Sequence, residues 1–316
     1  MRLRVVCLSI VALLFGVVTL AAKERGGPKR RARPPKWSAD VKDTFFEDAR
    51  TKLVGTRPQY EKATASIAAA SDTDSTTTTT DAPTGSGWSK LIAAEVIETE
   101  IKRLAQAVAK DVTTPSEFKG GTYKDCRRHF SVLAALFAVV GEYDGEARWQ
   151  DAAPSLRDLF SRAGRNCKVG TDQTFQEATQ RKQDLGDLVG GSRPQTSPVE
   201  RIADWAQVAD RPPLMQRMNI AHEERLTKWL ANQGEFTQHR DEIRHEAQLV
   251  AAIANVVARE GFEFWDDEQF AQYAQGLRQS ATDVAAAVEL DNFQQAQQAG
   301  SQMTKACANC HEGYRG

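Results

Sequence analysis

The sequence has few cysteines, no excess of charge of one sign and none of the short motifs of the common catalytic sites. Five cysteines among 316 residues are too few for a disulfide-rich scaffold. Lys and Arg number 41 against 42 Asp and Glu, so no broad basic field favours nucleic acid as a partner. No G-x-S-x-G, H-E-x-x-H or glycine-rich phosphate loop occurs. We therefore expect a protein that is not an enzyme.

What is present is an ordinary globular composition, with 41% apolar and 26% charged residues, which excludes disorder throughout the chain. The length suits about two domains of ~100 to 200 residues each. Residues 23–87 are predicted to form a basic arm, a short helix and a Thr-rich linker, and residues 190–199 to form a second linker. The two remaining blocks are residues 88–189 and 200–316.

The N-terminus has the pattern of an export signal. Two arginines precede an apolar run at residues 5–20, and two alanines and a charged stretch follow. The run is shorter than the ~20 residues that a membrane-spanning helix needs. We predict a signal peptide at residues 1–22 and an exported, periplasmic protein, with an uncleaved membrane anchor as the alternative.

The second block shows the period of amphipathic helices. Apolar residues recur at alternating spacings of four and three in the series Phe270, Ala274, Leu277, Ala281, Val284 and Val288. Similar series begin at Ile243 and Phe293, and a less regular one includes Met215, Met218, His222 and Trp229. No alternation typical of strands is evident. The patterns predict an all-α four-helix bundle, an architecture that holds cofactors between facing helices.

The first block follows the same plan. FQEATQ at residues 175–180 matches FQQAQQ at residues 293–298, a shift of 118 (293 − 175). A shift of 117 (243 − 126) aligns an apolar series that begins at Cys126 with the series that begins at Ile243. We interpret this as a duplication that gives two tandem four-helix bundles. Chance similarity between amphipathic helices is the alternative.

Residues 307–311 form a C-x-x-C-H motif. Two thiols spaced in this way near a helix end can add to the two vinyl groups of one haem, and the adjacent imidazole can bind the iron. A thioredoxin-like disulfide would need a strand ahead of the motif, and a zinc site would need a second pair of ligands. Neither context is present, so we predict one covalent haem c.

The motif continues into Tyr314 and Arg315, and the tripeptide WDD at residues 265–267 opens the preceding predicted helix. At the end of a four-helix block, this pattern resembles the cytochrome c′ family, including its low-spin relatives. The resemblance covers residues 200–316 well and the first block only in outline.

The resemblance implies roles for individual residues. Cys307 and Cys310 would form the thioether bonds and His311 would be the proximal iron ligand. Arg315 and Arg217 would lie near the haem edge.

The opposite axial face would come from the first helix of the bundle, at residues 214–218 (LMQRM). Either Met215 or Met218 would complete a six-coordinate iron, whereas Leu214 over the iron would leave room for a small gas. We expect His222, one turn further on, to be a solvated or capping residue.

The first block has no thiol or imidazole where the second block has its haem motif, so we expect it to bind no haem. Cys126 lies near the start of one predicted helix and Cys167 near the end of the next. Antiparallel neighbours bring such ends together, which predicts a disulfide between the two cysteines. Two buried free thiols are the alternative.

Three functions fit these patterns. The first is an electron carrier that exposes a haem edge to a redox partner protein. The second is a haem protein whose vacant sixth position binds nitric oxide or carbon monoxide. The third is an interaction module of a larger redox complex, in which the first block docks. Family members often dimerise, so we expect either a homo-oligomer or a pairing of the two bundles within one chain.

Overall fold

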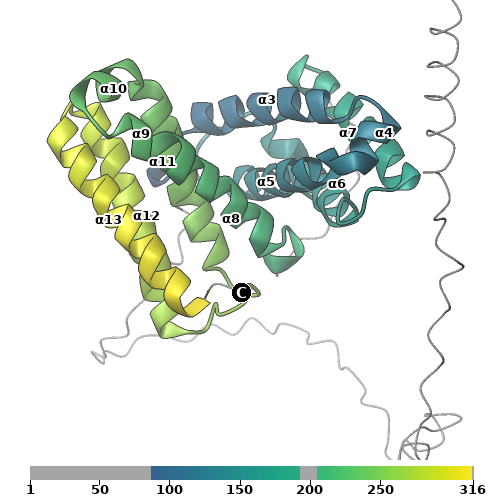
Figure 1. Ribbon diagram of the computed structural model, residues 1–316. Coiled ribbons are helices and arrows are strands. Elements are labelled where there is room, and N and C mark those ends of the chain that lie inside the picture. Colours follow the sequence, from purple (N-terminus) through teal and green to yellow (C-terminus); the bar gives the residue numbers. More distant parts are fainter. Residues whose placement is uncertain (1–86, 193–204, 315–316) are drawn as a thin grey trace, which may run out of the picture. The chain divides into compact units, whose positions relative to one another are not determined.

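The computed structural model describes residues 87–192 and 205–314, which belong to one compact unit (Figure 1). These residues form helices and no strands, as predicted. The predicted signal peptide, nearly all of the arm and first linker, most of the second linker and Arg315 lie outside the described residues. Among the helices that are described, none has the length and apolar character needed to cross a membrane.

The first block is built around four long helices. The elements are η2 (Trp88–Lys90), α3 (Ala94–Asp111), α4 (Pro115–Glu117), η3 (Phe118–Thr122), α5 (Tyr123–Gly141), η4 (Gln150–Ala152), α6 (Ala153–Asn166) and α7 (Asp172–Val189). Helix α5 packs against α3 and α6, and α7 packs against the same two helices. The amphipathic sequences explain this arrangement, because each helix buries one apolar face, which in α3 runs from Val96 to Val108.

The second block repeats the plan. Its elements are η5 (Trp205–Gln207), α8 (Arg211–Asn219), η6 (Ile220–Leu226), α9 (Thr227–Trp229), α10 (Gln233–Gln238), α11 (Arg240–Val257), α12 (Glu268–Glu289) and α13 (Phe293–Tyr314). The three regular apolar series of the sequence lie on α11, α12 and α13. Helix α12 packs against α11 and α13, and α11 also packs against α8 and the π-helical η6.

Three pairs of corresponding elements begin 117 residues apart, namely η2 and η5 (205 − 88), α3 and α8 (211 − 94), and α5 and α11 (240 − 123). The last two pairs differ slightly, at 115 residues between α6 and α12 (268 − 153) and 121 residues between α7 and α13 (293 − 172). This regularity is what a duplication predicts.

Residues that are 117 positions apart also contact each other. The pairs are Trp88 with Trp205, Glu100 with Arg217, and Glu142 with Arg259. The two ring centroids are 5.8 Å apart, and each guanidinium has a nitrogen 2.9 Å from a carboxylate oxygen. Helix α3 contacts α11, and α5 contacts α8. Reciprocal contacts of this kind are those of an isologous dimer, in which equivalent residues meet on the twofold axis.

A buried ionic network lies at this interface. Arg217 Nε donates to Glu100 Oε1 (2.9 Å) and Arg217 Nη1 donates to Glu246 Oε2 (2.7 Å). His245 Nε2 is 2.9 Å from Glu100 Oε2, and Arg225 also pairs with Glu246. The charged side chain of Arg217 is only 5% exposed. Arg217 therefore points into the contact between the blocks.

The network predicts a loss of stability in acid. Burial by itself raises the pKa of Glu100. The Arg217 charge and the hydrogen bonds from His245 and Arg217 outweigh this effect, so the pKa falls from an ordinary 4.5 to about 2. Because the folded-state pKa lies below the unfolded one, this stabilisation is complete above about pH 4.5 and is lost as the pH falls toward 2. We expect the urea midpoint, followed by circular dichroism, to fall in this window, and to fall less in Glu100→Gln. A midpoint as sensitive in the variant as in the wild type would contradict the assignment.

The core of the first block is filled by stacked aromatic rings. Phe137 and Phe160 are fully buried with centroids 5.6 Å apart, and Phe130 stacks on the other side of Phe160 at 6.1 Å. Phe137 lies 117 positions before Ala254, on helices that begin 117 residues apart. In the second block this position lines a cavity. A large ring thus occupies in one block the position at which a small side chain borders a cavity in the other.

Cys126 and Cys167 are both buried free thiols. The predicted disulfide is therefore absent, and the structure agrees with the alternative. Burial raises the pKa of both thiols, that of Cys167 to about 12, and the neighbouring Cys167 sulfur contributes to the rise at Cys126. Such thiols stay protonated and unreactive at neutral pH.

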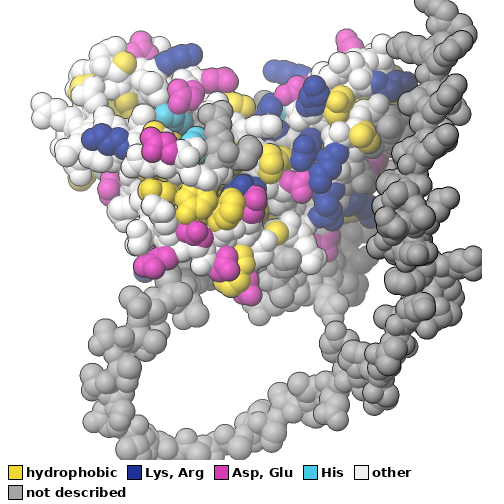
Figure 2. Space-filling view, turned by 60° about the horizontal axis from the view of Figure 1, so that its bottom comes forward, with side chains coloured by type: hydrophobic (Ala, Val, Ile, Leu, Met, Phe, Trp, Pro, Cys, Tyr) yellow, Lys and Arg dark blue, Asp and Glu magenta, His cyan; other side chains and the backbone are white. Residues whose placement is uncertain are grey.

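Charged side chains of both signs are spread over the face drawn in Figure 2. This distribution agrees with the formal net charge of -1.

Candidate functional site

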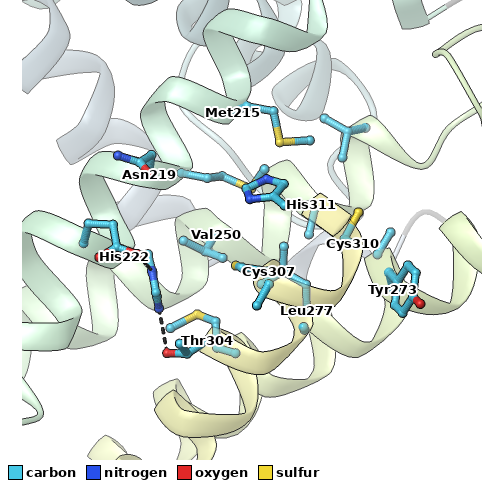
Figure 3. A pocket seen from close by; sticks show the side chains of 18 of the residues that line it. Met215, Asn219, His222, Val250, Tyr273, Leu277, Thr304, Cys307, Cys310 and His311 are labelled. Atoms are coloured by element: carbon cyan, nitrogen blue, oxygen red, sulfur yellow. Dashed lines mark hydrogen bonds and ion pairs between the residues drawn. The ribbon is translucent and has the colours of Figure 1, made fainter. Parts of the chain in front are cut away.

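The second block contains a cavity of about 270 Å³ between α8, η6, α11, α12 and α13 (Figure 3). Much of its apolar wall comes from one face each of α11 and α12. The residues of this part of the wall are Val250, Ala254, Val257, Phe270, Ala274 and Leu277. The volume is near the lower end of the ~300 to 1,000 Å³ typical of ligand pockets.

Cys307, Cys310 and His311 all line this cavity from the last turns of α13. Positions i, i+3 and i+4 of a helix share one face, so the C-x-x-C-H spacing alone places the two thiols and the imidazole together. The same face continues the apolar series of α13, in which Met303 is buried. His311 is exposed as well as lining the cavity, so the cavity opens to solvent here.

The two cysteines of the motif are free, partly buried thiols. Burial raises the pKa of the Cys307 thiol to about 11 and also raises the pKa of Cys310. Both groups are therefore neutral at pH 7. They are also accessible from the cavity, because they form part of its lining.

The facing wall is formed by α8 and η6. Met215 and Met218 both line the cavity, and Figure 3 shows Met215 on the helix that faces the His311 ring. Leu214 is fully buried but is not part of the lining. Of the alternatives in this pentapeptide, the structure brings the two methionines to the motif and not Leu214.

His222 is not a solvated residue, contrary to expectation. It is 7% exposed and lines the cavity from the π-helical segment η6. Its Nε2 is 2.8 Å from the Thr304 hydroxyl and its Nδ1 is 2.9 Å from Glu223 Oε1. The Thr304 hydroxyl also donates to the Gly300 carbonyl. His222 follows Met215 by seven residues and Met218 by four, so helical spacing already places it on the face that lines the cavity.

The end of α13 is tied to the start of α12. Tyr314 donates a 2.8 Å hydrogen bond to Asp267 Oδ1, and Asp267 also caps α12 by accepting from the Phe270 backbone N–H. The Asp267 hydrogen bond is the first cause that raises the pKa of Tyr314 to about 12. The Tyr314 ring packs against Phe264 and Phe270, with centroids 5.1 and 5.4 Å away. These contacts hold the C-x-x-C-H motif beside the cavity.

Sequence reasoning missed Asn219, Tyr273 and Thr304 as part of the lining. Thr304 lies one turn before Cys307 on the same face of α13, and this spacing could have found it. Within residues 87–192 and 205–314, no group of three or more His, Cys, Asp or Glu side chains is arranged to hold a metal ion.

No known protein family, no curated protein and no solved structure matches the chain.

Proposed function

We propose that this protein is an exported c-type cytochrome of cytochrome c′ type that carries one covalent haem c in its second block and transfers electrons. The observation that carries the proposal is that the C-x-x-C-H side chains and two methionines from a facing helix line one apolar cavity. The two blocks would be tandem four-helix bundles, of which only the second binds haem.

The residues present fit a haem. Cys307 and Cys310 would form the thioether bonds, and His311 would bind the iron from α13. The haem would supply one-electron redox chemistry, with a potential set by the axial ligands and by burial. The chain's own contribution is to hold the cofactor, to exclude water with the apolar wall of α11 and α12, and to leave an edge exposed at the mouth of the cavity.

Met215 or Met218 is the proposed second axial ligand. His222 is less suited, because both of its ring nitrogens are in hydrogen bonds that would have to break. The alternative is a five-coordinate iron that binds nitric oxide or carbon monoxide, and the apolar residues Val250 and Ala254 on the cavity wall favour it. Absorption spectra of the oxidised and reduced protein separate low-spin six-coordinate from high-spin five-coordinate iron. The same spectra of Met215→Ala and Met218→Ala then show which methionine is the ligand, because only its loss removes the low-spin spectrum.

An electron carrier of this kind transforms no substrate, so we do not propose an enzyme. Its partner would be a redox protein in the same compartment. Arg315, which follows the described residues, keeps its proposed place near the haem edge. The third alternative, an interaction module, would assign the docking role to the first block.

The test is the attachment of haem to the full chain in a host that matures c-type cytochromes. We expect a coloured protein whose mass exceeds that of the polypeptide by one haem and whose haem resists acid–acetone extraction. Cys307→Ser combined with Cys310→Ser should remove the covalent haem, because no thiol remains to add to a vinyl group. Cys126→Ser combined with Cys167→Ser is the matched control and should keep it. A colourless wild type with both motif thiols open to alkylation would overturn the proposal.

A further inference from the structure

Arg217 stands on the helix that carries both candidate axial methionines. At about 100° per residue, Met215 and Met218 share one face of α8, and Arg217 projects from another. The methionines line the cavity, whereas the Arg217 side chain is buried against Glu100 of the first block. The direction in which Arg217 is held therefore fixes the rotation of α8 about its axis.

Glu100 contacts residues on two of the helices that form the cavity wall. One carboxylate oxygen accepts from Arg217 on α8, and the other lies 2.9 Å from His245 Nε2 on α11. Helix α11 also carries Val250 and Ala254 of the cavity wall. The Glu100 side chain is 3% exposed, so water does not compete for these contacts.

A second copy of the chain could not replace the first block in this role. In a symmetric pair of second blocks, Arg217 would face Arg217 and Arg259 would face Arg259 on the axis. Within the chain, these positions instead face Glu100 and Glu142. Like charges brought together are unfavourable, above all at the buried position of Arg217. The first block is thus matched to the second by charge.

We propose that the first block is a built-in partner of the cavity, and that Glu100 is a positioning residue that sets the placement of Met215 and Met218 through Arg217. This inference rests on the proposed function for what the methionines bind, and on the packing alone for the positioning. The inference assigns a structural role to the first block, which is proposed to bind no haem.

The test uses Glu100→Gln in the full chain, which keeps the shape of the side chain and removes its charge. Glu98→Gln, on the same helix but in a surface ion pair, is the matched control. The first readout is hydrogen exchange without cofactor. Amides of α8 should exchange about tenfold faster or more in Glu100→Gln, with α13 unchanged, and Glu98→Gln should behave as the wild type.

The second readout is the haem itself. Glu100→Gln should change the spin-state bands or the midpoint potential, whereas Glu98→Gln should not. If Glu100→Gln does not fold, Glu100→Asp, which keeps the charge but shortens the reach, takes its place with the same expectations. Faster exchange spread evenly over all helices, or an unchanged spectrum and potential, would overturn the positioning role. A wild type without haem would overturn the proposed function instead, and hydrogen exchange would still decide the positioning.

Discussion

Replacing Arg217 with Leu is expected to lower the free energy of unfolding by about 3 to 5 kcal/mol, the usual cost of removing one partner from a buried charge network. The substitution leaves the Glu100 and Glu246 carboxylates buried without the guanidinium that bridges them. Urea unfolding of the full chain followed by circular dichroism measures the loss. Arg103→Leu, at an exposed position of α3, is the control and should change stability by less than about 0.5 kcal/mol.

The pH dependence identifies the cause of this loss. At neutral pH the Glu100 carboxylate of Arg217→Leu has lost the guanidinium that stabilises its charged form, so the difference from the wild type is largest there. As the pH falls toward about 2, protonation of Glu100 removes the same ion pair from the wild type. The two proteins should therefore converge in acid. A difference that does not depend on pH would point to lost packing rather than to charge.

Replacing Ala254 with Phe is expected to abolish most haem attachment while leaving the fold intact. Ala254 is fully buried and lines the cavity, and its counterpart in the first block is Phe137. A ring at this position would fill the space between α8, α11 and α12 as it does in the first block. We expect covalent haem to fall by about tenfold or more, and the stability of the protein without haem to change by less than about 1 kcal/mol.

Two further substitutions test whether filling the cavity is what prevents haem attachment in Ala254→Phe. Ala252→Phe, on the same helix but outside the cavity lining, must displace packed side chains at a cost of about 1 to 3 kcal/mol, yet should keep the haem. Phe137→Ala removes a fully buried ring from the first block and should cost about 3 to 5 kcal/mol. Haem attachment to Ala254→Phe at the wild-type level would show that the cavity is not the haem site.

Much of the fold could be predicted because its helices are amphipathic. The series from Ile243, Phe270 and Phe293 have the period of a helix with one buried face, and they lie on α11, α12 and α13. The site was predictable for a similar reason. A C-x-x-C-H motif on a helix brings its three side chains to one face without any help from the rest of the molecule.

The structure adds most at residues whose environment comes from distant parts of the chain. The partner of Arg217 is a carboxylate 117 positions away. His222 was expected to be solvated or to cap a helix, but it is 7% exposed and lies 2.8 Å from Thr304 on another helix. Cys126 and Cys167 lie near the ends of neighbouring helices, but they are free thiols.

The sequence by itself determined the helical class, the similarity of the two blocks and the grouping of Cys307, Cys310 and His311. These are local or periodic properties, set by which residues share a face of one helix. Only the tertiary structure decided that the blocks meet at equivalent positions, that Glu100 neutralises Arg217, and that Phe137 fills the space Ala254 leaves open. Such pairings depend on how helices far apart in the chain pack, and the period of a single helix carries no information about its partner.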